Sequence, residues 1–411
     1  MQLYLMHEDN QVALFNTNDL KDMQLINVEL LPFLPWAGST DKRFLLRQWI
    51  KERCIQITRK GYKSDAKGQP IDIAFHNLGV SLTDHYWYKP VNSNYTWSNI
   101  NPFTNDFESS PSLEAVYADA KNYRQDHFNP SATLLGNVKK KWIIDSQGNR
   151  VLLKGNELST QQVFNELFAC ELCKRLGFKN YVTYTKQTMT TNGQEIIGSA
   201  CKCMTDINTE LIHAYEILLL KHKNDVSHYQ FYISYCSEHG IDIDELKYNI
   251  DMSIIVDFLM TNDDRHCANF GILRDAKTFK FLKPAPLFDT GNSMFWNMDI
   301  PLNSKELFKL NIKGFCKHEL KLLKLLSRRD YNLDNLPSAS DVYDFYKESV
   351  PDIAAKIASW YNVKMTYLKK NVIVSSSNID HYGITPTMAK AHSIDFNDVL
   401  ACKALSEKIM K

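Results

Sequence analysis

The chain has 411 residues, more than one ordinary hydrophobic core accommodates, so two or three domains or lobes are expected. Its composition, 44% hydrophobic and 23% charged, is that of a globular protein and excludes a disordered chain. The 48 basic and 47 acidic residues leave a formal net charge of +1, which predicts no direct binding to nucleic acid and no attraction to an anionic membrane.

The cysteines and the N-terminal residues favour a reducing compartment. Nine cysteines, an odd number, are scattered along the chain, which is not typical of a disulfide framework. Residues 1–9 contain no basic segment followed by an apolar run, so we expect no signal peptide. No run of 18 apolar residues occurs in the sequence, so we expect no membrane-spanning helix and a cytoplasmic location.

Residues 1–125 form an N-terminal accessory region of mixed, aromatic-rich sequence. Residues 41–50 predict a helix, and residues 91–110, rich in Asn and Ser, predict loops on a folded module. The region contains no catalytic pattern, and the chain shows no internal repeat. Its sequence therefore does not identify a substrate or a partner.

Residues 126–206 predict strands around one helix, and they begin with a hairpin. Its strands are expected at residues 141–144 and 151–154, with a polar turn at residues 146–149. The second strand ends at Lys154. A lysine in that position can simply be a solvated strand end.

The helix of this region is expected to begin near Thr160 and to end at Gly177, because glycine is a usual C-terminal stop. Glu166 falls on a largely apolar stripe of this helix. A lone buried carboxylate is costly, so we expect Glu166 to have a cationic partner, although it can also be a boundary residue of an amphipathic helix. Two further strands are expected near residues 181–189 and 195–204.

Residues 207–411 have mainly helical periodicity. We expect helices at residues 210–221, 229–237, 244–260, 304–326 and 340–365. A sheet-rich first half followed by a helical second half favours two lobes with a cleft between them.

A polar motif, residues 262–269, interrupts the helical pattern with the sequence Asn-Asp-Asp-Arg-His-Cys-Ala-Asn. A hairpin is expected over residues 270–282, and Asn269 and Asp289 both lie just outside its open end. An amide and a carboxylate there suit Mg²⁺ together with nucleotide phosphates. Asp264 is a carboxylate that can orient a hydroxyl nucleophile. Taken singly, each of these residues is also typical of an ordinary turn.

The segments Asp264–Phe270 and Pro286–Asp289 resemble the catalytic and metal-binding segments of HipA-like kinases. These are bacterial serine/threonine protein kinases, and they are related to the phosphatidylinositol kinases. The resemblance covers mainly residues 131–365. It implies an α+β, bilobal protein-kinase-like fold, with a sheet-rich N-lobe in residues 126–206 and a helical C-lobe in residues 207–411.

The resemblance also implies roles for the polar motif in a kinase that uses ATP and Mg²⁺. Asp264 corresponds to the catalytic base, and Asn269 and Asp289 correspond to the Mg²⁺ ligands. His266 belongs to the same catalytic loop, where we expect it to brace the loop rather than to transfer a proton.

Weaker matches precede the polar motif in the order that the family requires. Lys154 resembles the phosphate-binding lysine, and Glu166 occupies the place of the helix glutamate that pairs with it. A strand lysine facing a helix carboxylate would fix its ammonium near the α- and β-phosphates. The hinge between the two lobes would lie beside the adenine. The backbone groups of Lys202 and Met204 are the expected contacts with this base.

The segment 133–141 occupies the position of the family's phosphate-covering loop. It has one glycine, so Gly136 and Asn137 are the expected phosphate contacts, since backbone N–H groups can cradle phosphate without a full glycine pattern. Its lysines can equally form a solvated basic turn. Some family members autophosphorylate a serine in this loop, and Ser131 and Thr133 are the hydroxyls present here.

A different site can be drawn from the cysteines. Cys170, Cys173, Cys201 and Cys203 could together bind zinc. Cys170 and Cys173 lie on an expected amphipathic helix, however, where small cysteines pack well.

The sequence therefore predicts a HipA-like kinase that transfers the γ-phosphate of ATP to a Ser or Thr hydroxyl of a protein. Two alternatives stay open: a lipid or small-molecule kinase, and a nucleotide-binding regulatory module without turnover. Family members often act as toxins paired with a DNA-binding antitoxin. The resemblance thus raises an antitoxin or regulatory protein as a partner, without direct evidence in the sequence.

Overall fold

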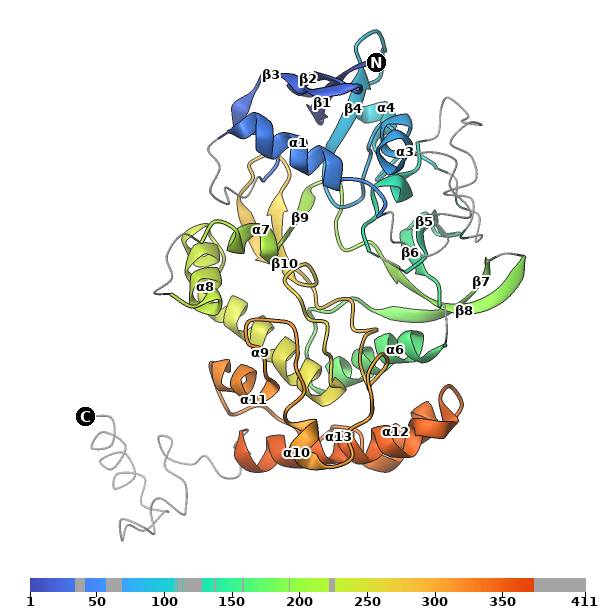
Figure 1. The fold of residues 1–411 in the computed structure, drawn as a ribbon, viewed down its shortest axis with the longest axis vertical. Coiled ribbons are helices and arrows are strands. Elements are labelled where there is room, and N and C mark those ends of the chain that lie inside the picture. The colour runs from blue at the N-terminus through green and yellow to red at the C-terminus, as the bar shows by residue number, and fades with distance from the viewer. Residues whose placement is uncertain are drawn as a thin grey trace, which may run out of the picture.

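The structure is a computed structural model that describes residues 1–33, 41–56, 69–107, 109, 113, 128–136, 138–156, 159–191, 193–221 and 226–372. It is a mixed α and β fold, as the sequence predicts, with two sheets in the first half, and a third sheet and most of the described helices in the second half (Figure 1). Among the described residues, no helix is long and apolar enough to cross a bilayer.

The N-terminal region contains an antiparallel four-stranded sheet in the order β3, β2, β1, β4. Its strands are β1 (Gln2–His7), β2 (Asn10–Asn16), β3 (Asp19–Leu25) and β4 (Tyr86–Pro90). The helices and short turns of this region are η1 (Val28–Leu30), α1 (Lys42–Glu52), α3 (Pro70–His76) and α4 (Trp97–Ile100). Leu46 and Ile50 of α1 and Phe75 of α3 join the core on one face of the sheet. The helix predicted at residues 41–50 is therefore present as α1, with Asp41 as its N-cap.

A second antiparallel sheet has the order β5, β6, β8, β7 and follows η2 (Pro130–Thr133). Its strands are β5 (Lys140–Ile144), β6 (Arg150–Lys154), β7 (Tyr184–Thr191) and β8 (Gln194–Lys202). Helix α6 (Gln161–Arg175) contacts this sheet through β7 and β8. It ends where the sequence predicts, with Gly177 in a left-handed conformation just beyond it.

A third sheet has the order β11, β10, β9 and contains a difference from the prediction. Its strands are β9 (Thr209–His213), β10 (Gly271–Asp275) and β11 (Phe281–Pro284). The prediction of a helix at residues 210–221 is wrong for residues 210–213, which belong to strand β9. Helix α7 (Ala214–Leu218) begins only after that strand. Pairing of β9 with β10, about sixty residues later, outweighs the local helical pattern.

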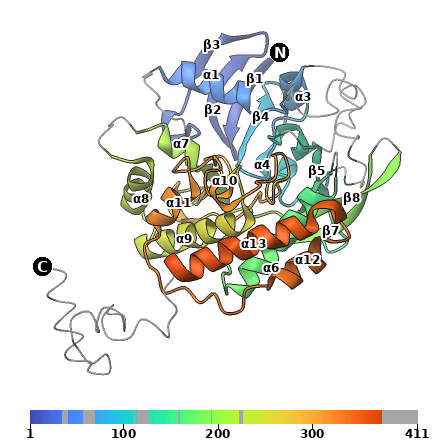
Figure 2. The same cartoon turned by 60° about the horizontal axis from the view of Figure 1, so that its bottom comes forward.

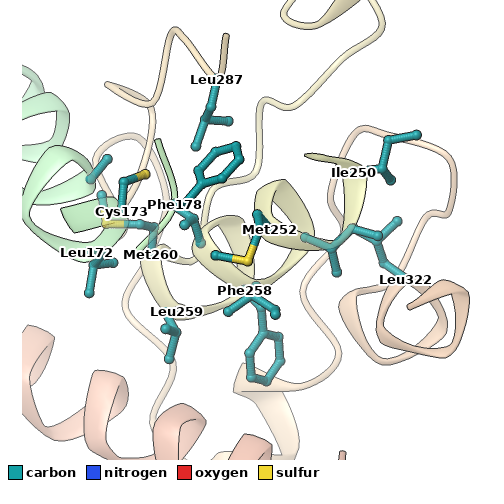
Figure 3. Close-up of a cluster of buried hydrophobic side chains, with 14 of the residues drawn as sticks. Leu172, Cys173, Phe178, Ile250, Met252, Phe258, Leu259, Met260, Leu287 and Leu322 are labelled. Atoms are coloured by element: carbon teal, nitrogen blue, oxygen red, sulfur yellow. The ribbon is translucent and has the colours of Figure 1, made fainter. Parts of the chain in front are cut away.

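The remaining helices form the other end of the molecule. They are α8 (His228–Glu238), α9 (Ile243–Met260), α10 (Ser304–Leu307), α11 (Glu319–Leu322), η3 (Leu323–Leu325), α12 (Ala339–Tyr346) and α13 (Pro351–Asn371). Helix α9 contacts α6, α8 and α13, and α13 runs along the outer side of this group (Figure 2). Residues from all sides of the C-terminal half of α9 are buried. Met260 lies beside Leu172 and Cys173 of α6 (Figure 3), and the ring of Phe258 packs against the rings of Phe308 and Tyr367.

Two predicted helices are interrupted. The expected helix at residues 304–326 is wrong, because α10 and α11 are separated by a turn in which Asn311 pairs with His318. That turn contacts the polar motif, since the backbone N–H of Lys313 donates to the carbonyl of Asp263 at 2.9 Å. The expected helix at residues 340–365 is two helices, because Pro351 begins α13 and cannot continue α12.

A buried polar cluster joins the N-terminal sheet to the third sheet. The carboxylate of Glu210, on β9, accepts from His7 Nε2 at 3.1 Å, from the backbone N–H of His85 at 2.8 Å and from Arg274 Nε at 2.8 Å. Burial acts to raise the pKa of Glu210, but Arg274 and His7 outweigh it and lower this pKa to about 2. The accessory region is thus attached to the rest of the chain through an ionised carboxylate.

Candidate functional site

A buried lysine lies between two carboxylates from different parts of the chain. Lys154 Nζ, at the end of β6, bonds Glu166 of α6 and lies 2.8 Å from Oδ1 of Asp289. Glu166 also accepts from Ser199 Oγ on β8. Lys154 is 9% exposed and Glu166 is 2% exposed. The cationic partner predicted for Glu166 is therefore present, and it compensates the cost of burying both charges.

The charges of this cluster shift one another's pKa values. Burial acts to lower the pKa of Lys154, but Asp289 and Glu166 raise it well above its usual value. Burial raises the pKa of Glu166, and Lys154 opposes this shift only in part. Burial also acts to raise the pKa of Asp289, but Lys154, Lys140 and Arg265 hold it well below its usual range. At neutral pH the lysine is therefore charged and Asp289 is ionised.

The polar motif is held by a buried ion pair to Asp257 of α9. Arg265 Nε donates to Asp257 Oδ2 at 2.8 Å, and Arg265 Nη1 donates to the carbonyls of Asn269 at 2.6 Å and Phe288 at 2.5 Å. One guanidinium thus binds the backbone at Asn269 and at the residue before Asp289. It therefore adds a second link between these two segments to the pairing of β10 with β11, the hairpin on which the sequence expectation for Asn269 and Asp289 rests.

Asp289 has an unusual backbone conformation. Its φ is 56°, in the left-handed region that a non-glycine residue rarely adopts, and its backbone N–H lies 3.2 Å from the hydroxyl oxygen of Tyr184. Such a conformation persists where the surroundings hold it, and here Arg265 binds the preceding carbonyl while Lys154 binds the carboxylate.

Both carboxylate oxygens of Asp264 have a partner. Lys313 Nζ lies 2.5 Å from Oδ1, and Asn292 Nδ2 donates to Oδ2 at 2.7 Å. The side chain of Asp264 is 17% exposed. Its backbone carbonyl accepts from Asn269 Nδ2 at 2.9 Å and from the N–H of His266 at 2.7 Å.

His266 lies within this loop and contacts its backbone. Its Nδ1 accepts from the N–H of Ala268 at 3.2 Å, and its carbonyl accepts from the N–H of Asn269 at 2.8 Å. These contacts are those of a residue that braces the loop.

Asn269 and Asp289 have oxygens that fit a metal ion. The amide nitrogen of Asn269 donates to the carbonyl of Asp264, which leaves Oδ1 as the amide atom with the chemistry of a metal ligand. Lys154 binds Oδ1 of Asp289 and leaves Oδ2 for another partner. Two protein oxygens are few for a cage of protein ligands, but they match Mg²⁺, which takes its remaining ligands from phosphates and water.

Among the described residues, those expected to contact the nucleotide have fewer contacts that connect them to the rest of the site. Gly136 has φ 98°, and a Cβ added there would lie 2.6 Å from the ammonium of Lys140. Asn137 lies outside the described residues. Lys202 ends β8 with an exposed side chain, and Met204 packs beside a cluster that includes Val182 and Phe288.

The two hydroxyls considered for autophosphorylation are buried and hydrogen bonded. Ser131 Oγ accepts from the N–H of Trp142 at 2.9 Å, and Ser131 is fully buried. Thr133 Oγ1 lies 3.1 Å from the carbonyl of Val80 and 3.0 Å from that of Pro130. In this conformation neither hydroxyl is exposed to a phosphoryl donor.

The zinc alternative is not supported. Among the described residues, no group of three or more His, Cys, Asp and Glu side chains is arranged to hold a metal ion. Cys170 Sγ donates to the carbonyl of Val182, and Cys203 Sγ donates to that of Leu82, so these thiols serve local packing.

Sequence reasoning missed several residues of this site. Asn292 comes three residues after Asp289, and that proximity is a signal that could have found it. Lys313 had no such signal, because its segment has helical periodicity. Ser199 contacts Glu166 only through the pairing of β6 with β8.

Two cavities lie beside the site rather than in it. One, of about 50 Å³, lies behind the polar motif and is lined mainly by apolar residues, together with the polar residues Asn249, Ser253, Asp257 and Arg265. The other, of about 410 Å³, is an open groove on α6 whose lining includes Leu167 and Lys174. Neither is lined by Lys154, Asp264 or Asp289.

Comparison with known proteins adds a partial similarity. No protein-family model matches the chain. The serine/threonine-protein kinase CtkA of Helicobacter pylori is 28% identical over 157 residues, which are 37% of this chain and 46% of that protein. The chain thus matches about half the length of this curated relative. The crystal structure of the H. pylori proinflammatory kinase CtkA aligns with 58% of this chain and 89% of that chain, at 18% identity and a TM-score of 0.41. Over part of its length, the chain is similar to a serine/threonine protein kinase.

Proposed function

We propose that this chain is an ATP- and Mg²⁺-dependent kinase that transfers the γ-phosphate to a Ser or Thr hydroxyl of a protein. The observation that carries the proposal is the contact of Lys154 with both Glu166 of α6 and Asp289. A buried lysine held by a helix glutamate beside an ionised aspartate is an arrangement that binds nucleotide phosphates. The partial similarity to a serine/threonine protein kinase supports the same reaction and a protein as the acceptor.

On the nucleotide side, Lys154 would bind the α- and β-phosphates while Glu166 orients its ammonium. Asn269 and Asp289 would hold Mg²⁺, which when bound offsets negative charge on the phosphates. The backbone at Gly136 would cover the phosphates, and the backbone at Lys202 and Met204 would meet the adenine.

On the acceptor side, Asp264 would orient the hydroxyl and accept its proton as the oxygen attacks the γ-phosphorus. Its backbone is fixed through Asn269 and His266, and the loop is fixed through Arg265. A base held in this way loses little freedom when the acceptor binds, which is how positioning lowers a barrier.

The test is incorporation of labelled γ-phosphate from ATP into protein by the purified chain. We expect Asp264→Ala to lower the rate by about 10²-fold or more, while binding of a fluorescent nucleotide persists. Asp289→Ala should lose Mg²⁺-dependent nucleotide binding as well. Asp334→Ala, at an exposed aspartate, is the matched control and should behave like the wild type.

Other outcomes would contradict the proposal. Transfer by Asp264→Ala at the wild-type rate would exclude Asp264 as the base. Transfer to lipid or a small molecule but not to protein would overturn the proposed acceptor, and nucleotide binding without turnover would make the chain a regulatory module. A phosphoproteome of cells expressing the wild type or Asp264→Ala would identify the substrate.

A further inference from the structure

The two partners of Asp264 occupy the carboxylate that is proposed to accept the hydroxyl proton. Lys313 bonds Oδ1 and Asn292 bonds Oδ2, so an incoming hydroxyl must share one of these oxygens with its present partner or displace that partner. A carboxylate that accepts a proton from a hydroxyl must be within hydrogen-bond reach of it. The partner that is held less firmly is the one that an incoming hydroxyl can displace.

Asn292 is anchored on its other side. Its Oδ1 accepts from Gln162 Nε2 at 2.8 Å, and Gln162 lies on α6 one turn before Glu166. A short relay of side chains thus connects Asp264 to the helix that also orients Lys154.

The loop around Asn292 is fixed as well. Asn165 Nδ2, also on α6, donates to the carbonyl of Gly291 at 2.8 Å and to that of Ser293 at 2.7 Å. Asn165 is fully buried, and its Oδ1 accepts from the hydroxyl of Tyr346 at 2.9 Å. The backbone on both sides of Asn292 is therefore attached to α6 by hydrogen bonds.

Lys313 is held differently. Its backbone N–H is bonded to the carbonyl of Asp263, but its side chain is 62% exposed. An ion pair of so exposed a lysine is weak, and the four-carbon stem is flexible. The ammonium can therefore leave Oδ1 at little cost while its backbone keeps it beside the loop.

We propose that the two partners of Asp264 have different roles in phosphoryl transfer, an inference that rests on the proposed function. Asn292 is a positioning residue that keeps Oδ2 of Asp264 at a fixed place relative to α6. Lys313 yields Oδ1 to the acceptor hydroxyl and then binds the oxygens of the transferring phosphoryl group.

The reaction step balances without a further reactant. The acceptor oxygen forms a bond to the γ-phosphorus, and the bond from that phosphorus to the oxygen bridging to the β-phosphate breaks, so ADP leaves with the electron pair. The hydroxyl proton passes to Oδ1 of Asp264 and then to water. Lys313 keeps its protons, and its positive charge offsets the charge on the phosphoryl oxygens.

Lys313→Ala tests the phosphoryl contact, and Lys317→Ala is its matched control. Lys317 is an exposed lysine of the same turn, where its carbonyl accepts from the N–H of Ile312. We expect Lys313→Ala to lower kcat by about 10²-fold with nucleotide affinity nearly unchanged, and Lys317→Ala to have no effect. A wild-type kcat in Lys313→Ala overturns this role. Absence of transfer by the wild type would instead reject the proposed function, so the two failures are distinguishable.

Single and double variants of Gln162 and Asn292 test the positioning relay. We expect Asn292→Ala to lower kcat by about tenfold or more with KM for ATP nearly unchanged, and Gln162→Ala to have a smaller effect of the same kind. Because both act through one carboxylate, the double variant should be no slower than Asn292→Ala alone. Additive losses in kcat, or no loss in either single variant, would overturn the relay. Thermal unfolding checks that each variant is folded, and if Asn292→Ala is not, the kcat of Gln162→Ala decides.

Discussion

Lys154 and Asp289 are 135 residues apart in the chain, yet the ammonium of one lies 2.8 Å from the carboxylate of the other. This contact connects the second sheet to the loop that follows the third sheet. It places a buried positive charge beside the carboxylate that we propose as a Mg²⁺ ligand.

Removing Lys154 should destabilise the chain as well as prevent nucleotide binding. Lys154→Met leaves Glu166, which is 2% exposed, without its cation, and such a loss costs about 3–5 kcal/mol of the free energy of unfolding. The double variant Lys154→Met with Glu166→Gln removes the uncompensated charge and should recover part of this stability. Urea unfolding at neutral pH measures both, and a double variant less stable than the single one would contradict the explanation.

Arg265 should be essential to the geometry of the site. Arg265→Ala removes the bonds to Asp257 and to the two backbone carbonyls, leaving a buried carboxylate unpaired, with an expected cost of about 3–5 kcal/mol. The control is Arg328→Ala, since Arg328 pairs with Asp330 on the surface and should matter by about 1 kcal/mol or less. Equal unfolding free energies for the two variants would refute the buried role of Arg265.

Glu210 should make the free energy of unfolding depend on pH in the acid range. The pKa of Glu210 is lowered to about 2 in the folded chain, below its unfolded value, so its contribution is fully present above about pH 4.5 and is lost as the pH falls toward 2. The difference amounts to about 3 kcal/mol. Glu210→Gln should be less stable at pH 7 and should show a weaker loss between pH 4.5 and 2. An unchanged acid dependence of unfolding in this variant would exclude Glu210 as its source.

Gly271 should not tolerate a side chain. A Cβ added there would lie 2.1 Å from the carbonyl oxygen of Ile212, on the neighbouring strand, so Gly271→Ala must separate β9 from β10. We expect a loss of about 1–3 kcal/mol and lower activity, because β10 begins just after the polar motif. At Gly291 the added atom meets nothing nearer than 3.5 Å, so Gly291→Ala is the control for thermal unfolding. A wild-type melting temperature for Gly271→Ala would show that the strands can adjust.

Much of the local structure follows from the sequence. The end of α6 can be predicted from the sequence because Gly177 terminates the helix. The hairpin of β5 and β6 can be predicted from its polar turn. The sequence also gives the order of the candidate site residues along the chain, which is Lys154, Glu166, Asp264 and Asp289. These signals are local, since they depend on residue types within one element or on their order.

Other features depend on contacts between distant segments. The strand β9 looks helical by periodicity, and it is a strand because β10 pairs with it. The segment of Lys313 also looks helical, and it turns instead to bond the polar motif. A periodic pattern records which side chains are apolar, but it does not record which backbone will supply the hydrogen bonds.

The sequence by itself determined which groups are present: a strand lysine, a helix glutamate and a polar loop with a later aspartate, in that order. Only the tertiary structure decided that Lys154 bonds two carboxylates at once and that Asp264 is held by Asn292 and Lys313. The physical reason is that burying a charge is favourable only beside its partners, and those partners come from segments that the fold alone brings together.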